Sequence, residues 1–198
     1  MNLVWKGFWT AIFGICLVKV AYAEWQPIEE VRSYAVSGRS GAQLYESIGQ
    51  RGPMTGQTRA IAHTTFKLTW TRKYEPRGNT CVLSVQKPKL IITYTLPKAE
   101  DPLPASVRSS WQSFIEGIRT HEKSHGQSII RMVRAIETQT LGLTEQDDPT
   151  CRKLRVTLQA RLKALSDRQR EEGRAFDQAE MSEGGNVQQL VLKLVNGP

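Results

Sequence analysis

The chain has 198 residues, enough for one domain with a substantial core and too few for several large ones. Its formal charge is +8, but the basic residues are scattered along it with acidic residues among them, as between Arg168 and Glu172. Such mixing is typical of solvated helix surfaces and argues against a nucleic-acid-binding face, so we predict no nucleic-acid partner.

The first 23 residues have the pattern of a secretory signal peptide. Lys6 precedes an apolar run from Gly7 to Val18, and Ala21-Tyr22-Ala23 supplies the small residues that signal peptidase requires. The apolar run is too short to span a bilayer, so we expect cleavage after Ala23 and no stable membrane anchor. The mature protein, residues 24–198, is predicted to be a single domain in the periplasm or outside the cell.

The first half of the mature chain, residues 24–100, is predicted to be rich in β-structure. In the segment 58–71 apolar and polar residues alternate, which indicates a strand with one face buried and the other in water. The segment 74–80 is predicted to be a hairpin loop, and Pro88 and Pro97 are expected to break and to end the later strands. The expected strands are 31–36, 58–71, 81–85 and 89–96, with one short helix at 42–50.

Residues 101–181 are predicted to form two long helices. Apolar residues recur at steps of three and four from Trp111 to Ile136, and a second such series runs from about Cys151 to Phe176. The short connection between them favours an antiparallel pair. The predicted fold is therefore α+β, a small antiparallel sheet packed against a long antiparallel helical hairpin. The tail, residues 182–198, is compatible with a docked strand or a frayed end.

Two cysteines, Cys81 and Cys151, belong to the mature chain. In an oxidising compartment such a pair is expected to form a disulfide, which would join a strand to the start of the second long helix. Two buried free thiols are the alternative. A zinc site made from these cysteines fits less well, because neither has another cysteine or a histidine nearby at ligand spacing.

The first long helix contains the motif HExxH, from His121 through Glu122 to His125. Residues four apart point the same way from a helix, so both imidazoles can bind one Zn²⁺. Glu122 is then expected to be the general base that activates the attacking water. Alternatively, the two histidines are core residues without a metal. Their place in the apolar series favours the metal, because buried imidazoles need polar partners.

Catalytic zinc usually has three protein ligands, so the motif alone is incomplete. His63 is the third histidine of the chain, but its position on the polar face of the predicted strand favours a solvent-facing side chain. The end of the second helix offers Asp177, Glu180 and Glu183, and an antiparallel pair would return this segment towards the motif. Ordinary surface carboxylates are the alternative for each of them. We predict Asp177 and Glu183 as candidate metal ligands.

The order of these features resembles that of the bacterial predicted secreted zinc-dependent proteases, over most of the mature chain. In that family the segment after the second helix usually reaches a His-Gly pair, where this chain has Glu183-Gly184. The resemblance implies either a zinc site in which glutamate replaces histidine, since glutamate also ligates zinc, or a degenerate member of the family. The matching features are Tyr34-x-Val36-x-Gly38, Leu44, Arg51-Gly52-Pro53, Thr58-Arg59, Trp70, Cys81-Val82, Tyr94-x-Leu96-Pro97, Trp111, the HExxH motif with Gly126, Cys151 and Phe176-Asp177.

Taken together, the sequence predicts a secreted or periplasmic zinc-dependent metallopeptidase that hydrolyses peptide bonds. Its substrate is expected to be a peptide or protein, with cell-wall peptides included. The alternative is a non-catalytic binding module of the periplasm or cell envelope, in which the metal site is structural or lost.

Overall fold

The structure, a computed structural model, describes residues 25–197 of the chain. The predicted signal peptide and its cleavage site, residues 1–23, lie outside the described residues. Within residues 25–197, no helix combines the length and the apolar character needed to cross a membrane. The elements are β1 (Ile28–Val36), α1 (Gly41–Arg51), β2 (Met54–Thr55), β3 (Thr58–Arg59), β4 (His63–Arg77), β5 (Thr80–Ala99), α2 (Ala105–Thr140), β6 (Thr144–Gln146), α3 (Arg152–Met181) and α4 (Asn186–Val195).

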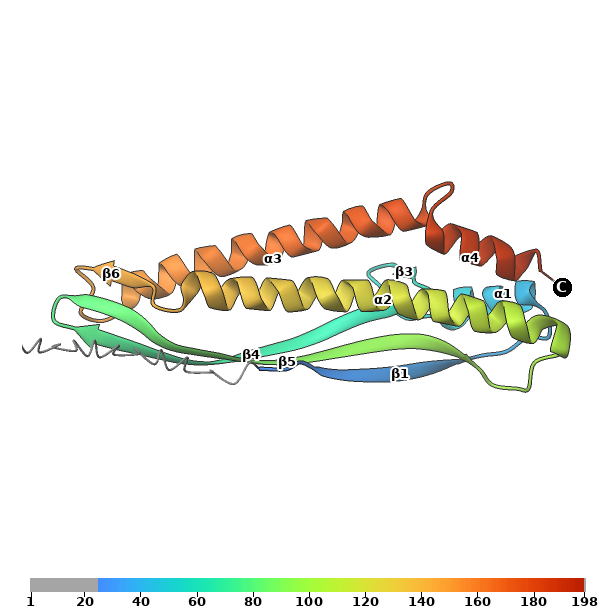
Figure 1. Cartoon of the computed structure of the whole chain (residues 1–198), viewed down its shortest axis with the longest axis horizontal. Coiled ribbons are helices and arrows are strands. Elements are labelled where there is room, and N and C mark those ends of the chain that lie inside the picture. Colours follow the sequence, from blue (N-terminus) through green and yellow to red (C-terminus); the bar gives the residue numbers. More distant parts are fainter. Residues whose placement is uncertain (1–24, 198) are drawn as a thin grey trace, which may run out of the picture.

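These elements form an elongated α+β domain in which helices cover one face of a long, twisted sheet (Figure 1). α2 lies lengthwise along the sheet, and α3 returns antiparallel to α2. The apolar side chains of α2 between Val107 and Ile136 pack against those of β5 in one core. Removing this apolar surface from water is the main force that holds the helices on the sheet. The predicted α+β fold, with a helical hairpin against a sheet, is confirmed.

The large sheet is organised around β5. β4 pairs with it antiparallel over most of its length, and β6 pairs antiparallel with its first residues. β1 pairs with its second half in parallel, from Ile28 opposite Ile91 to Val36 opposite Ala99. Parallel pairing of β1 is the one departure from a purely antiparallel sheet among the described strands. It requires a long crossover between the two strands, which α1 and the strands after it provide.

The expectation that Pro88 and Pro97 interrupt the strands is wrong, because β5 runs unbroken from Thr80 to Ala99. Proline cannot donate to a neighbouring strand, so it is tolerated where one side of its strand is open. Pro88 lies opposite Trp70 of β4, before the pairing with β1 begins. Pro97 lies opposite Tyr34 of β1, after the pairing with β4 has ended. At both positions β5 has only one neighbour.

The predicted strand 58–71 and the predicted loop 74–80 are also corrected. Thr58 and Arg59 belong to the small β2–β3 hairpin, and β4 begins only at His63. β4 then continues through Pro76 to Arg77, which pairs with Thr80. The reversal is therefore a tight turn at Gly78 and Asn79, and the left-handed backbone of Gly78, with a φ of 61°, suits such a turn.

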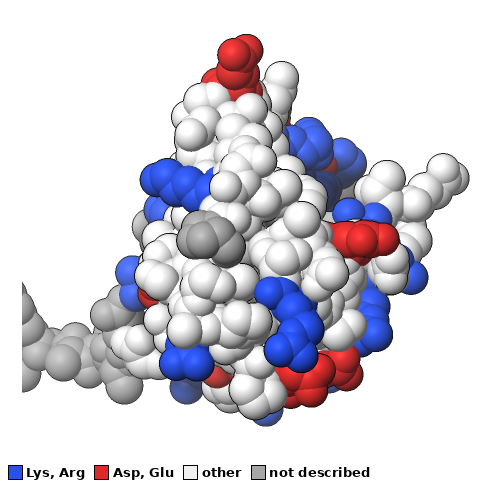
Figure 2. All heavy atoms as spheres, turned by 90° about the vertical axis from the view of Figure 1, so that its right-hand side faces the viewer, with Lys and Arg blue, Asp and Glu red and all other residues white. Residues whose placement is uncertain are grey.

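The tail forms a helix, α4, so neither a docked strand nor a frayed end describes it. Val187, Leu190, Val191 and Leu194 recur at steps of three and four, and this face packs into the main core. Gly41 of α1 allows the close approach, since a Cβ there would lie 1.8 Å from the carbonyl oxygen of Leu194. At this end of the molecule, basic, acidic and uncharged side chains are interspersed (Figure 2).

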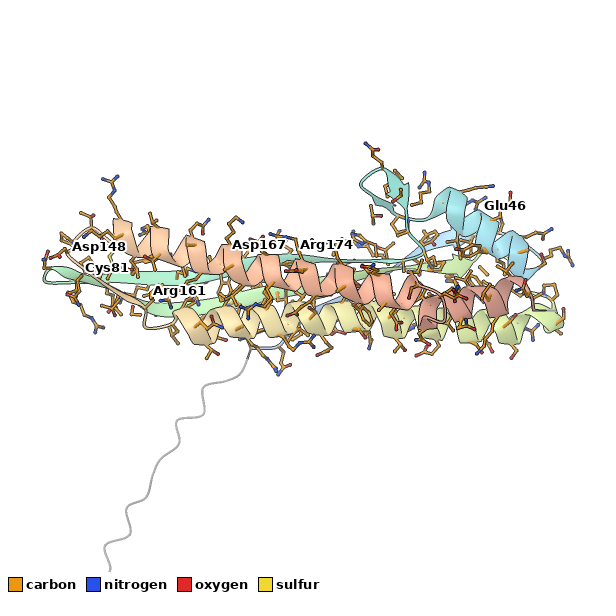
Figure 3. All side chains as sticks on the ribbon, turned by 90° about the horizontal axis from the view of Figure 1, so that it is seen from above. Glu46, Cys81, Asp148, Arg161, Asp167 and Arg174 are labelled. Atoms are coloured by element: carbon orange, nitrogen blue, oxygen red, sulfur yellow. A yellow bond between two sulfur atoms is a disulfide. The ribbon has the colours of Figure 1, made fainter. Side chains whose placement is uncertain are left out.

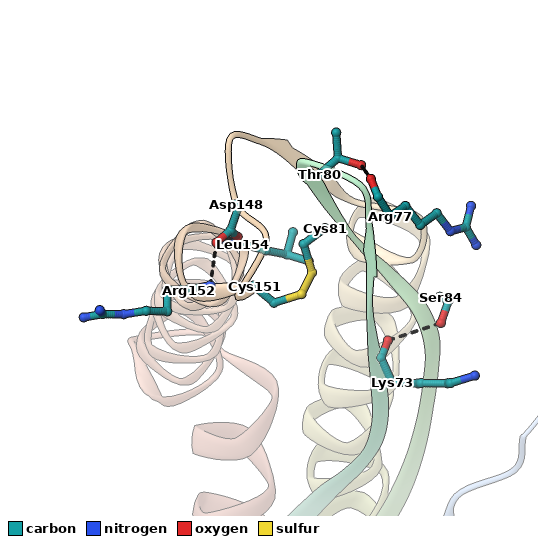
Figure 4. The surroundings of a disulfide bond; sticks show 9 residues. All are labelled: Lys73, Arg77, Thr80, Cys81, Ser84, Asp148, Cys151, Arg152 and Leu154. Carbon is teal, nitrogen blue, oxygen red and sulfur yellow. Dashed lines mark hydrogen bonds between the residues drawn. A yellow bond between two sulfur atoms is a disulfide. The ribbon is translucent and has the colours of Figure 1, made fainter.

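At the opposite end, Cys81 of β5 and Cys151 form the expected disulfide, with their Cα atoms 5.2 Å apart. Cys151 directly precedes α3, so the bond joins the sheet to the start of that helix (Figure 4). The carboxylate of Asp148 accepts hydrogen bonds from the backbone N–H groups of Arg152, at 2.7 Å, and Leu154, at 2.8 Å. This end of α3 is therefore held both covalently and by a cap.

Candidate metal centre

Three side chains from the two long helices converge beside the sheet. His121 and His125 lie one turn apart on α2, and Asp177 comes from α3. The Nε2 atoms of the two histidines are 3.2 Å apart. Oδ1 of Asp177 lies 3.2 Å from Nε2 of His121 and 2.8 Å from Nε2 of His125. The antiparallel arrangement of α2 and α3 thus brings residues more than fifty positions apart in the sequence to one point.

The geometry of these three atoms suits a small divalent cation. Zinc binds nitrogen and oxygen ligands at about 2.0–2.2 Å in a tetrahedral arrangement, which places the ligand atoms roughly 3.3 Å from one another. Within residues 25–197, this is the one group of three histidine, cysteine or acidic side chains whose ligand atoms all lie within 4.8 Å. Without a metal, both Nε2–H groups can instead donate to the same oxygen of Asp177.

Charge at the site favours a cation. Burial raises the pKa of Asp177, but the hydrogen bonds from His121 and His125 outweigh this and hold the pKa well below its usual range. Burial lowers the pKa of His121, but its hydrogen bond to Asp177 and the charges of Glu122 and Asp177 raise the pKa above its usual value. The same negative charges that stabilise a protonated imidazole would also stabilise a metal ion.

Phe176 and Glu180 lie beside the ring of His121. The ring of Phe176 stacks on it, with centroids 4.8 Å apart and planes inclined by 17°. The other ring nitrogen, Nδ1, is buried and has no hydrogen-bond partner among the described residues. Oε2 of Glu180 lies 3.6 Å from it, slightly beyond hydrogen-bond distance. Metal-bound histidines commonly donate this second N–H to a carboxylate, and Glu180 is placed to accept it.

Glu122 lies on the side of α2 that faces the sheet and is only 5% exposed. Its Oε2 accepts a hydrogen bond of 2.5 Å from the hydroxyl of Thr64 on β4. The same hydroxyl lies 3.2 Å from the backbone oxygen of Glu122. The sheet therefore fixes the orientation of this carboxylate.

Gly126, which directly follows the motif, permits close packing of α2 on the sheet. A Cβ at this position would lie 2.1 Å from the hydroxyl oxygen of Tyr94 on β5. Any larger residue would push α2 away from the strand. The position of Glu122 relative to Thr64 depends on this contact, because Thr64 lies opposite Tyr94 in the β4–β5 pair.

A cavity of about 660 Å³ opens beside the group, between the β2–β3 hairpin and the two long helices. His121, His125, Asp177 and Glu122 line it, and the side chain of Asp177 remains 53% exposed. His63, expected to face solvent, is half-buried in the wall of this cavity but is not part of the group of converging ligand atoms. The converging atoms are therefore accessible from solvent.

Of the two candidate ligands after the motif, Asp177 joins the histidines and Glu183 does not. α3 continues to Met181, so Glu183 lies beyond the helix end, exposed in the turn that leads to α4. The group of ligand atoms around His121 and His125 contains Asp177 alone among the described acidic residues. We therefore do not retain Glu183 as a ligand.

Sequence reasoning missed two kinds of residue. The contact between Thr64 and Glu122 had no sequence signal, because packing alone sets the register of β4 against α2. Arg170 and Arg174, which line the cavity, were detectable, since they precede Asp177 by seven and three residues on one helix face.

Comparison with known proteins places the chain in a family without assigning an activity. No curated protein and no solved structure is significantly similar to it. A family model described as "Bacterial protein of unknown function (DUF922)" matches residues 31–185, a segment that contains His121, Glu122, His125 and Asp177. The chain therefore belongs to this bacterial protein family of unknown function.

Proposed function

We propose that this protein is an exported zinc-dependent hydrolase of peptide bonds. The observation that carries the proposal is the convergence of Nε2 of His121, Nε2 of His125 and Oδ1 of Asp177 within 3.2 Å of one another. Glu122, the buried acid between the two histidines, lines the same cavity. Three protein ligands leave one position of a tetrahedral ion open, as catalytic zinc sites require.

In this proposal each residue has a separate task. His121, His125 and Asp177 would hold the ion, which supplies Lewis-acid activation of the scissile carbonyl and of the attacking water. Glu122 accepts the proton of that water and delivers it to the leaving amine. The hydroxyl of Thr64 fixes the orientation of the Glu122 carboxylate. The ring of Phe176 stacks on that of His121, and Glu180 would accept the N–H of Nδ1 once the metal is bound.

Export is part of the proposal, and the disulfide supports it. Disulfides persist mainly in oxidising compartments such as the periplasm and the cell exterior. The Cys81–Cys151 bond lies in the structural core of one end of the molecule, where both cysteines are buried. The proposed substrates are peptides or proteins of those compartments, cell-wall peptides included.

One observation favours the second candidate, a non-catalytic binding module with a structural metal. The carboxylate of Glu122 is nearly buried and already accepts a hydrogen bond from Thr64. If this bond also holds when metal is present, less of the carboxylate faces the cavity. The two candidates share the metal and differ in whether Glu122 moves a proton.

Metal analysis of the mature protein, purified from the periplasm with its disulfide intact, tests the proposal. We expect about one zinc per chain in the wild type and in the control His63→Ala, and none in His121→Ala or Asp177→Ala. Glu122→Gln should keep the zinc and lose hydrolysis of an unspecific protein substrate. Zinc bound equally by His121→Ala would refute the site. Equal behaviour of wild type and Glu122→Gln in every hydrolysis assay would refute the enzyme.

A further inference from the structure

We propose that the cavity beside the metal centre selects peptides with a carboxylate one or two residues from the bond that is cleaved, and that Arg174 binds this carboxylate. The inference rests on the proposed function for the meaning of "cleaved bond". The preference for a carboxylate, however, is a binding property, and it can be measured without any hydrolysis.

The charges that line the cavity are mostly positive. Three arginines, Arg59, Arg170 and Arg174, belong to its wall, against two acidic residues, Glu122 and Asp177. Both acidic side chains have partners of their own, Thr64 for Glu122 and the two histidines for Asp177. A bound divalent ion would add two further positive charges. The cavity therefore favours a ligand that brings negative charge.

The arginines of α3 are aligned with the metal ligand. Arg170, Arg174 and Asp177 follow one another at steps of four and three, so they share one face of the helix. Gly173 lies beside α2, since a Cβ there would be in van der Waals contact with Nδ1 of His125, at 3.8 Å. Arg174 starts about 4.5 Å along the helix axis from Asp177. An extended peptide advances about 3.3 Å per residue, so its first or second residue beyond the metal reaches this guanidinium.

The three arginines differ in the hydrogen bonds and ion pairs that their guanidinium groups form within the protein. Arg59 donates to the backbone oxygen of Gly52 at 2.6 Å, and this bond holds the loop before the β2–β3 hairpin. Arg170 donates to the hydroxyl of Ser166 at 2.9 Å and pairs with Asp167.

The side chain of Arg174, whose place on α3 is shown in Figure 3, makes no hydrogen bond or ion pair with any residue between 25 and 197. An unpaired guanidinium at the wall of a cavity can bind a carboxylate with two parallel hydrogen bonds. Arg174 is therefore the residue we assign to the substrate.

The carboxylate has two chemical sources, the free C-terminus of a peptide and the side chain of an aspartate or glutamate. Three related peptides distinguish the two sources. The first is neutral with an amidated C-terminus, the second is the same peptide with a free C-terminus, and the third is the amidated peptide with one residue replaced by glutamate. Fluorescence anisotropy measures their binding to the zinc-loaded mature protein in a Glu122→Gln background, which prevents cleavage during the measurement.

We expect one or both carboxylate peptides to bind about 10- to 100-fold more tightly than the neutral peptide, the usual effect of a charge-assisted hydrogen bond. Arg174→Gln should reduce this ratio to about twofold or less. The control Arg168→Gln, which removes a cation from the same helix but outside the cavity wall, should leave the ratio unchanged. The carboxylate peptide that binds the protein more tightly than the neutral peptide does identifies the source of the carboxylate.

Equal binding of neutral and carboxylate peptides, or a preference that survives Arg174→Gln, would overturn the inference. The result for the carboxylate preference can be told apart from the result for peptide hydrolysis. A preference lost in Arg174→Gln together with a wild type that hydrolyses no peptide would refute the enzyme and support the carboxylate site. Hydrolysis without any preference for a carboxylate would do the reverse.

Discussion

The two ends of the helical hairpin differ in whether their buried polar groups have hydrogen-bond partners. At the disulfide end, Asp148 caps α3, and β5 exchanges backbone hydrogen bonds with the chain around Leu143. Around the metal centre, Nδ1 of His121 and the hydroxyl of Tyr94 are buried without hydrogen-bond partners among the described residues. The polar groups of the first end are satisfied within the fold, whereas the second end keeps buried polar atoms that lack a partner within the described residues.

The same two helices connect these ends. Asp177 follows Cys151 by 26 residues, which corresponds to about 39 Å along α3. The disulfide therefore fixes where α3 begins, but its packing on α2 decides where Asp177 lies. Each of the following variants disturbs one of the two ends.

The largest effect is expected from loss of the disulfide. The bond joins residues 70 positions apart, so replacing both Cys81 and Cys151 by serine should lower the free energy of unfolding by about 4 kcal/mol. Urea denaturation measures this loss. The affinity for zinc, measured by calorimetry under folding conditions, should stay within about threefold of the wild type. A parallel fall in zinc affinity would show that the ends are coupled.

Thr64→Val tests the contact between the sheet and the motif. The substitution keeps the shape and removes the hydroxyl that donates to Glu122, a hydrogen bond to a charged group worth about 1.5–3 kcal/mol. We expect the free energy of unfolding to fall by that amount. Thr65→Val is the matched control, because its side chain is exposed and should change stability by less than about 0.5 kcal/mol. Equal effects of the two variants would contradict the assigned contact.

Glu180→Gln should weaken zinc binding by about 10- to 100-fold, because a neutral amide supports the ring of His121 less well than a carboxylate. The melting temperature of the metal-free protein should not change. Glu183→Gln serves as the control at the same end of α3 and should bind zinc as the wild type does. The opposite result, with Glu183→Gln impaired and Glu180→Gln unaffected, would restore Glu183 as the ligand.

The smallest effect concerns the cap of α3 and depends on pH. Burial raises the pKa of Asp148, but hydrogen bonds from the backbone N–H groups of Leu154, Lys153 and Arg152 outweigh it and lower the pKa below its usual value. A carboxyl group with a lowered pKa stabilises the fold above its unfolded pKa, near 4, and loses this contribution as pH falls through its folded pKa. Zinc binding at the other end should not change.

For Asp148→Asn we expect a melting temperature roughly 2–6 °C lower at pH 7. This difference from the wild type should shrink below about pH 4. Calorimetry at pH 7, 5 and 3 measures it. A difference that grows with acidity would show that folding raises the pKa of Asp148 instead of lowering it.

Local patterns predicted much of this molecule. The apolar series of α2 and α3, the HExxH spacing and the cysteine pair each report a property of neighbouring residues or of composition, and the disulfide and the helical hairpin are confirmed. α4 was predictable on the same grounds, because its apolar residues recur at helical steps, but the glycines before it obscured the pattern.

Other features depend on contacts between distant segments. Pro88 and Pro97 lie inside one strand because β1 and β4 pair with different parts of β5, which no local pattern reveals. The choice of Asp177 over Glu183 depends on how far α3 continues and on which of its faces meets α2.

The sequence by itself determined the long helices, the cysteine pair and two of the three residues of the candidate metal site, because helix periodicity is a local property of the backbone. Tertiary structure decided the third residue of that site, the partner of Glu122 and the arginines of the cavity. Those contacts arise from the register between α2, α3 and the sheet, and burial of the shared core sets that register.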